Sequence, residues 1–242
     1  MTWLRSAVFN LWFFVLTFAL ALAGAAVQAL APQRIMTVPR LWARGTLGGL
    51  HWLCGIRFEV SGLEHLPAAG PALIASMHQS AFDTMIWARL APRFTYVLKQ
   101  ELTRIPLFGG MLRATGMIAI DRSGGPAAIR ILLREADRAV AAQRQIVIFP
   151  EGSRIAPGTA APLQPGIVAL AQRTRLPVIP VLTDSGKCWS RRAFRKLPGV
   201  IHVVLLPPLP AGLKRDELLT RLAAIYAAGL PAPVDNSVGE PL

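Results

Sequence analysis

The residues best suited to chemistry are a histidine and a carboxylate that follow a short apolar run. Residues 72–76 have the length and the neighbours of a buried strand, His78 comes just after them, and Asp83 lies five positions beyond His78. A neutral imidazole titrates at about pH 6 to 7, so it can take a proton from a hydroxyl group at neutral pH. A carboxylate that accepts the other ring N–H fixes the tautomer and stabilises the imidazolium that forms.

The spacing of His78 and Asp83 suits a junction between a strand and a helix. On one continuous helix the two side chains would point about 140° apart, whereas a turn between strand and helix lets both face one cleft. Ser80 and Asp83 also fit a helix-capping pattern, in which Asp83 serves only the helix and His78 is a buried core residue. This stretch alone leaves the catalytic and the structural interpretation open.

The composition points to a partner surface that is both apolar and negatively charged. The chain has 242 residues, of which 53% are hydrophobic, and a formal net charge of +13. That combination suits a protein that works at an anionic membrane surface. No nucleic-acid fold signature accompanies the charge, so we expect membrane lipids rather than nucleic acid as the partner. Cys54 and Cys188 form neither a CxxC pair nor a zinc-binding pattern, which favours a reduced, cytoplasmic setting.

An N-terminal apolar segment, residues 7–31, carries no charge. About 20 apolar residues cross the hydrocarbon core as a helix, so this segment can span the bilayer or lie in one leaflet. A cleaved signal peptide is the alternative, and we favour it less because the segment exceeds a usual signal core. More arginines follow the segment than precede it, which predicts that the rest of the chain lies on the cytoplasmic face of the cell inner membrane.

The remaining chain alternates strands and helices. The clearest helical pattern is residues 126–143, and residues 41–56 form either a second helix at the membrane interface or a helix packed on the domain. The predicted strands span residues 58–60, 72–76, 94–98, 117–120, 146–149, 178–182 and 201–206. This order predicts an α/β fold, a single domain with a central, mostly parallel mixed sheet flanked by helices, preceded by the hydrophobic N-terminal helix region.

Charged residues follow three further predicted strands: Lys99 first, then Asp121 and Arg122, then Glu151 and Arg154. An arginine can fork onto a phosphate, and a glutamate can accept a hydrogen bond from a substrate hydroxyl. Because ligands of parallel sheets bind beyond the carboxyl ends of the strands, we expect these residues to share one site with His78. The alternative for each cluster is a solvated turn or a surface ion pair.

Four blocks of the sequence together resemble a known family. The first runs from His78 to Asp83 in the pattern HxxxxD, and the second contains Lys99 and Arg122. The third is FPEGSR at residues 149–154, and the fourth is LPVIPV at residues 176–181. In this order they resemble the glycerolipid acyltransferases, specifically the 1-acylglycerol-3-phosphate acyltransferases.

The resemblance implies an organisation and a reaction. Residues 1–56 would be N-terminal membrane-anchoring helices, and residues 57–242 would be the acyltransferase domain, with the motifs in about residues 57–207. An acyl group would pass from acyl-CoA or acyl-carrier protein to the free hydroxyl of 1-acylglycerol-3-phosphate, giving phosphatidic acid for phospholipid biosynthesis. The family needs no metal and no cofactor.

The resemblance also implies a role for each site residue. His78 would be the general base and Asp83 would orient it, while residues 177–181 would be mainly structural and line the acyl side. The residues implied to hold the glycerol region are Glu151, Gly152 and Ser153, and those implied to hold the phosphate are Lys99, Arg122 and Arg154.

Other functions fit parts of the same pattern. The acceptor could be another lysolipid, such as a lyso-aminolipid, or the acyl group could pass to water, as in a thioesterase. A catalytically silent membrane-binding protein of the same fold is less favoured, because His78, Asp83 and Glu151 are all present. A separate basic cluster at residues 187–196 forms either a solvated loop or a face for lipid headgroups or an acidic carrier protein.

Overall fold

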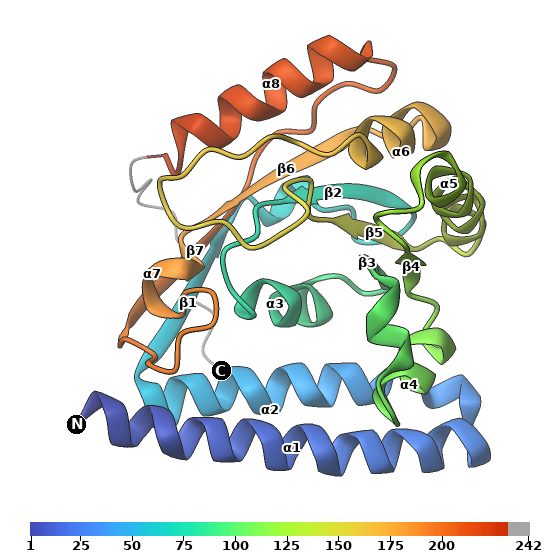
Figure 1. Ribbon diagram of the computed structural model, residues 1–242. Helices are drawn as coiled ribbons and strands as arrows, with labels where there is room; N and C mark the ends of the chain where they lie inside the picture. The colour runs from blue at the N-terminus through green and yellow to red at the C-terminus, as the bar shows by residue number, and fades with distance from the viewer. Residues whose placement is uncertain (232–242) are drawn as a thin grey trace.

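The computed structural model describes residues 1–231, which build a seven-stranded sheet with helices on both faces (Figure 1). The strand order across the sheet is β1-β7-β6-β2-β5-β3-β4. The strands are β1 (Ile56–Ser61), β2 (Ala72–Ser76), β3 (Phe94–Lys99), β4 (Ile118–Ile120), β5 (Gln145–Ile148), β6 (Val178–Thr183) and β7 (Gly199–Leu205). All seven predicted strands are therefore confirmed, with small differences at their ends.

Five strands of the sheet run in one direction. β6, β2, β5, β3 and β4 are parallel neighbours, whereas β7 is antiparallel to β6 and pairs in parallel with β1. The predicted mixed, mostly parallel sheet is confirmed. The carboxyl ends of the five parallel strands meet at one edge, where ligands of such sheets bind.

The helices divide into two layers around the sheet. They are α1 (Thr2–Leu30), α2 (Thr37–Cys54), α3 (Phe82–Leu90), α4 (Phe108–Ala114), α5 (Gly125–Ala141), α6 (Gly166–Thr174), α7 (Ser185–Cys188) and α8 (Arg215–Ala228). Single 3-10 turns lie at Pro32–Arg34, Leu63–His65 and Gln100–Arg104. Figure 1 shows α3, α2 and α1 below one face of the sheet, and α5, α6 and α8 on the other side.

The central strand β2 is buried on both faces. Ile74 packs with the side chains of α2 and α3, whereas Leu73 and Ala75 pack with those of α5 and α6. A strand covered on both faces needs apolar side chains pointing in both directions, which explains the unbroken apolar run that precedes His78. The strand that precedes the histidine is therefore packed from both sides.

Helix α1 lies lengthwise against α2 (Figure 1). The two helices come closest at two glycines: a Cβ on Gly45 would lie 2.7 Å from the Leu16 side chain, and one on Gly49 would lie 2.6 Å from the Trp12 ring. The Trp12 indole N–H also donates to the Gly45 carbonyl at 3.0 Å. The second predicted helix is thus α2, packed between α1 and α3. The unit boundary at residue 56 stays a prediction, and residues 232–242 of the predicted second unit lie outside the described residues.

Gly49→Ala should push α1 away from α2 and lower the unfolding temperature, because its methyl group would overlap the Trp12 ring. Overpacking of this kind costs about 1–3 kcal/mol. Gly48 has no heavy atom within 4 Å of the position of a methyl group, so Gly48→Ala should stabilise the protein by up to about 1 kcal/mol through helix propensity. Thermal unfolding in detergent measures both changes. Equal unfolding temperatures for the two variants would contradict the close approach of the helices.

Candidate active site

His78 and Asp83 form a hydrogen-bonded pair in the turn between β2 and α3. The His78 Nδ1 lies 3.0 Å from Asp83 Oδ2, and the Asp83 side chain is only 2% exposed. An ionised carboxylate only accepts hydrogen bonds, so the neutral imidazole carries its proton on Nδ1 and keeps the lone pair of Nε2 free. This is the tautomer that a general base needs.

Asp83 also holds the start of α3. Its Oδ2 accepts the backbone N–H groups of Gln79 at 2.7 Å and of Ser80 at 2.8 Å. The Ser80 hydroxyl in turn accepts the N–H of Phe82, the first residue of α3, at 3.2 Å. The geometry is compatible with both interpretations of Asp83, because one carboxylate accepts the backbone N–H groups before α3 and the ring N–H of His78. The catalytic role stays a prediction.

The loop after β5 fixes the position of His78 through three contacts. The Phe149 ring stacks on the imidazole with the ring centroids 4.1 Å apart. The His78 backbone N–H donates to Glu151 Oε2 at 2.7 Å, and the His78 carbonyl accepts the N–H of Ile155 at 2.8 Å. The FPEGSR block and the residue after it thus hold both the ring and the backbone of His78.

Glu151 is a buried carboxyl group with a strongly shifted proton affinity. Its pKa is raised to about 7, mainly by burial; the hydrogen bond from the His78 backbone opposes this shift, and the nearby charge of Asp83 adds to it. Its side chain does not line the cavity described below. The sequence predicted that Glu151 holds the substrate, whereas within the described residues its carboxylate accepts a hydrogen bond only from the backbone N–H of His78.

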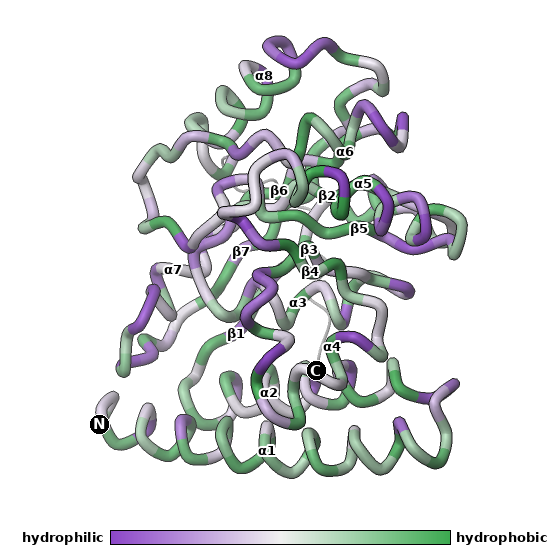
Figure 2. The backbone as a smooth tube through the Cα atoms, turned by 45° about the vertical axis from the view of Figure 1, so that its right-hand side comes forward, coloured by the Kyte–Doolittle hydropathy of each residue, from purple (hydrophilic) through white to green (hydrophobic). Residues whose placement is uncertain are grey.

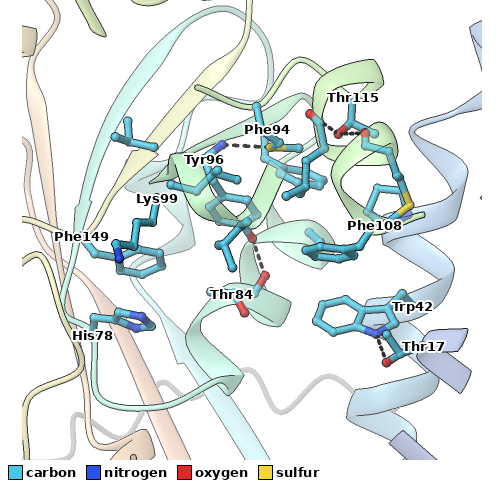
Figure 3. Close-up of a pocket in the computed structure, with 18 of the residues that line it drawn as sticks. Thr17, Trp42, His78, Thr84, Phe94, Tyr96, Lys99, Phe108, Thr115 and Phe149 are labelled. Atoms are coloured by element: carbon cyan, nitrogen blue, oxygen red, sulfur yellow. Dashed lines mark hydrogen bonds between the residues drawn. The ribbon is translucent and has the colours of Figure 1, made fainter. Parts of the chain in front are cut away.

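A cavity of about 520 Å³ opens beside His78 and extends toward α1 and α2 (Figure 3). Its far end is apolar, with Trp42 and Phe108 opposite the His78 and Phe149 end in the close-up. The apolar lining comes from several elements and includes Leu20, Val38, Trp42, Phe94, Phe108 and Met111. The cavity therefore joins the hydrogen-bonded histidine to a space suited to a hydrocarbon chain.

Basic side chains surround the end of the cavity that holds His78. The sequence predicted Lys99, Arg122 and Arg154, and all three line this cavity together with Gly152 and Ser153. Lys99 pairs with Glu101 at 2.8 Å, and Arg122 donates to the Gly152 carbonyl. Among the described residues Arg154 has no hydrogen bond or ion pair, so its guanidinium is available to a ligand.

Arg191 is a fourth cation of the cavity that sequence reasoning assigned elsewhere. It lines the same space as Arg154, and its charge helps to lower the pKa of Arg154, which burial lowers most. The sequence suggested only a separate basic cluster at residues 187–196. The sequence signal that could have placed Arg191 in the site is its position after the end of β6, the fifth of the parallel strands.

The fourth sequence block was expected to line the acyl side of the site. The structure does not place it there. Its strand, β6, is buried between β2 and β7, and none of its residues borders the cavity. The residue that does reach the site follows this strand: the Ser185 hydroxyl donates to Asp83 Oδ1 at 2.5 Å. Sequence reasoning did not single out this serine.

A family model described as Acyltransferase matches residues 57–184, which carry His78, Asp83 and the basic residues after β3, β4 and β5. The chain belongs to the acyltransferase family. This acyltransferase is 36% identical over 178 residues to the 1-acyl-sn-glycerol-3-phosphate acyltransferase of Pseudomonas aeruginosa, an alignment that covers 74% of this chain and 69% of the relative. A protein of the same name from Limnanthes alba is 36% identical over 77% of this chain and 68% of its own length.

A solved structure has the same fold. The crystal structure of the 1-acyl-sn-glycerophosphate acyltransferase from Thermotoga maritima superposes with a TM-score of 0.76. The superposition covers 94% of this chain and 95% of that one, at 19% sequence identity. The likeness extends over the N-terminal helices as well as the sheet, because nearly the whole of both chains is covered.

The arrangement suits base-assisted transfer to a hydroxyl group. His78 can accept the hydroxyl proton on Nε2, and Asp83 can stabilise the imidazolium that results. Within residues 1–231 no group of three or more His, Cys, Asp or Glu side chains is placed to hold a metal ion. The expected lack of a metal and of a cofactor stays a prediction for this acyltransferase.

Glu151→Gln should change how stability depends on pH. The folded protein keeps the Glu151 proton up to about pH 7, whereas the unfolded chain releases it near the ordinary value of 4.5. Wild-type stability should therefore fall as the pH rises between these values, by on the order of 3 kcal/mol from this group. Glutamine can still accept the His78 N–H but has no proton to lose, so the variant should not show this component.

The measurement compares thermal unfolding of the two proteins in detergent at about pH 5 and about pH 8. Other titrating groups contribute equally to both proteins, so the difference between the curves isolates Glu151. Unfolding temperatures that change in parallel would mean that the carboxyl group has an ordinary pKa.

Proposed function

We propose that this acyltransferase moves a fatty acyl group from an acyl thioester to the free hydroxyl of 1-acylglycerol-3-phosphate, giving phosphatidic acid in phospholipid biosynthesis. The observation that carries the proposal is the single cavity that joins His78, a ring of basic side chains and an apolar interior. The names of the relatives support the same acceptor. Both acyl-CoA and acyl-carrier protein can supply the thioester.

The transfer proceeds without an acyl-enzyme. His78 Nε2 takes the proton of the acceptor hydroxyl, and the oxygen attacks the thioester carbonyl. The C–S bond then breaks, and the leaving thiolate takes the proton from the imidazolium. In support of direct transfer, burial raises the pKa of both cysteine thiols, Cys54 and Cys188, so neither is an activated nucleophile.

The basic side chains hold the acceptor phosphate. Arg154 and Arg122 can each fork onto phosphate oxygens, and Lys99 adds a mobile cation at the same end of the cavity. Gly152 has a positive φ of 72°, which lets the backbone turn close to the ligand, and Ser153 offers a hydroxyl beside it. Glu151 acts on the acceptor indirectly, through the position of His78.

The N-terminal helix docks the enzyme on a membrane. Residues Thr2–Leu30 form a helix long and apolar enough to cross a bilayer, but only four of its residues are buried and its side lies along α2. Figure 2 shows α1 as predominantly hydrophobic along its length. We propose that α1 lies in one leaflet, at the cytoplasmic face of the inner membrane, because spanning the bilayer would separate it from α2.

Acyl transfer from a labelled thioester to a panel of lysolipids tests the reaction. Wild-type protein should acylate 1-acylglycerol-3-phosphate, and His78→Ala should reduce turnover by about 10²- to 10⁴-fold, the usual effect of losing a positioned base. Arg154→Ala should chiefly raise the KM for the phosphate-bearing acceptor and change the use of a neutral lysolipid little. Both acyl-CoA and acyl-carrier protein should be offered as donors.

Each other outcome of this assay would indicate a different function for the protein. Product from another lysolipid alone would keep the mechanism and replace the acceptor. Thioester loss without lipid product would indicate a hydrolase. Full activity of His78→Ala would remove the general base, and inactivity of the wild-type protein with every donor and acceptor would favour a membrane-binding protein.

Charges on the exposed face of α1 should release the protein from membranes. Phe14 and Phe18 are 68% and 62% exposed and lie one turn apart on this helix, so Phe14→Asp with Phe18→Asp should strongly reduce co-sedimentation with anionic vesicles. Ile131, an exposed apolar residue of α5, provides the control through Ile131→Asp. Equal vesicle binding by all three proteins would contradict docking through α1.

A further inference from the structure

The ends of four parallel strands supply the site residues that the sequence predicted, and the fifth strand end has no assigned role. β6 ends at Thr183 and turns into α7, which begins at Ser185. Ser185 is fully buried, and its hydroxyl donates to Asp83 Oδ1 at 2.5 Å. The two residues are 102 positions apart in the chain, so this bond is a tertiary contact between neighbouring strand ends.

The turn that carries Ser185 is fixed from several sides. The Ser185 backbone N–H donates to the Thr183 hydroxyl at 3.1 Å, and the next N–H, that of Gly186, donates to the Gln79 side chain at 3.2 Å. A Cβ at Gly186 would lie 2.8 Å from Pro157 and 3.1 Å from Gln79, so the chain passes very close to the loop after His78. The serine hydroxyl is thereby held at a fixed place beside Asp83.

A second anchor lies on the other side of the same turn. Asp184 accepts the backbone N–H of His202, in β7, at 2.8 Å, and its other oxygen lies 3.1 Å from the His202 ring. Lys187 completes this group at 3.3 Å from Asp184. The turn is thus tied to β7 as well as to the histidine loop, and Ser185 cannot move away from Asp83 without breaking these bonds.

The two oxygens of Asp83 depend on different donors. Oδ2 receives the His78 ring N–H and the backbone N–H groups of Gln79 and Ser80, whereas Ser185 is the only donor to Oδ1 in the described part of the chain. A buried carboxylate oxygen without a donor favours protonation of the group. By the same effect, loss of the donor to Oδ1 would concentrate the negative charge of Asp83, which would then hold an imidazolium at His78 more tightly.

We propose that Ser185 is a positioning residue of the transfer reaction, whose hydroxyl disperses the charge of the Asp83 carboxylate and keeps it oriented on Nδ1 of His78. The proposal rests on the proposed function, in which His78 is the base. Ser185 does not touch the substrates, because it is fully buried and does not border the cavity. Its effect should therefore appear in turnover and in proton affinity rather than in substrate binding.

Three further ionisable groups act on this pair and stay unchanged in the test. Glu151 and Arg154 interact electrostatically with Asp83, and so does the buried hydroxyl of Tyr96. Loss of the serine hydroxyl concentrates the negative charge of Asp83, so the pair should hold a proton more tightly. The acid limb of the pH profile should then move to higher pH.

The test compares Ser185→Ala with Ser185→Thr, which keeps the hydroxyl, and with Ser190→Ala, which removes an exposed hydroxyl from the same segment. Ser185→Ala should lower kcat by roughly 10- to 100-fold with nearly unchanged KM for both substrates, the usual effect of leaving one charged group without its donor. Its acid limb should move up by about one pH unit. Ser185→Thr should recover most of the turnover, and Ser190→Ala should match the wild type.

A second measurement follows the protonation of His78 and does not depend on turnover. Diethyl pyrocarbonate modifies neutral imidazole, so the pH dependence of His78 modification, followed by peptide mass spectrometry, reports its proton affinity directly. The midpoint should move to higher pH in Ser185→Ala and stay in place in Ser190→Ala. This result does not require the proposed acceptor to be correct, so failure of the function and failure of the inference are distinguishable.

Either of two results would overturn the role of Ser185. One is an unchanged modification midpoint in Ser185→Ala. The other is a folded Ser185→Thr protein that is as slow as Ser185→Ala, because the hydroxyl would then not be what matters. Should Ser185→Ala fail to fold, the turnover and modification midpoint of Ser185→Thr decide between these outcomes.

Discussion

The buried negative charge of Asp83 constrains the whole site. A carboxylate that is 2% exposed must be surrounded by donors, and here they come from the His78 ring, from the backbone N–H groups of the turn before α3 and from the hydroxyl of Ser185. These groups meet only because β2 and β6 are parallel neighbours whose carboxyl ends share one edge. The order of the strands is therefore needed to bring donors to the buried charge of Asp83 as well as to form the core.

The segment that carries Ser185 is also the segment that meets α1. Lys196 is 3% exposed and lies 4.8 Å from the centroid of the Trp189 ring, and it donates to the side chain of Asn10 and to the Phe194 carbonyl. Burial lowers the pKa of this ammonium group, and aromatic faces rather than a carboxylate surround it. One stretch of chain thus contacts both the N-terminal helix and the buried carboxylate of Asp83.

The sequence predicted those features that depend on local pattern. The strand preceding His78 was recognisable because burial on both faces demands an unbroken apolar run, and the basic residues followed from their places at strand ends. Ser185 and the position of Arg191 were not recognisable, because a hydroxyl bond between residues 102 positions apart leaves no periodicity. The position of α1 was also open, since its composition suits a spanning helix and only the glycines of α2 reveal the lengthwise packing.

The cavity has a consequence for how the enzyme distinguishes fatty acids. Its wall includes Leu20 of α1 and Val38 and Trp42 of α2, so with α1 in one leaflet, as proposed, an acyl chain already dissolved in the bilayer would pass from lipid to protein without crossing water. The hydrophobic gain of about 0.8 kcal/mol per CH₂ applies to chains that leave water, and here it largely cancels. Longer chains then gain no general advantage in affinity, and selection among them depends on the depth and shape of an interior bounded by Trp42 and Phe108.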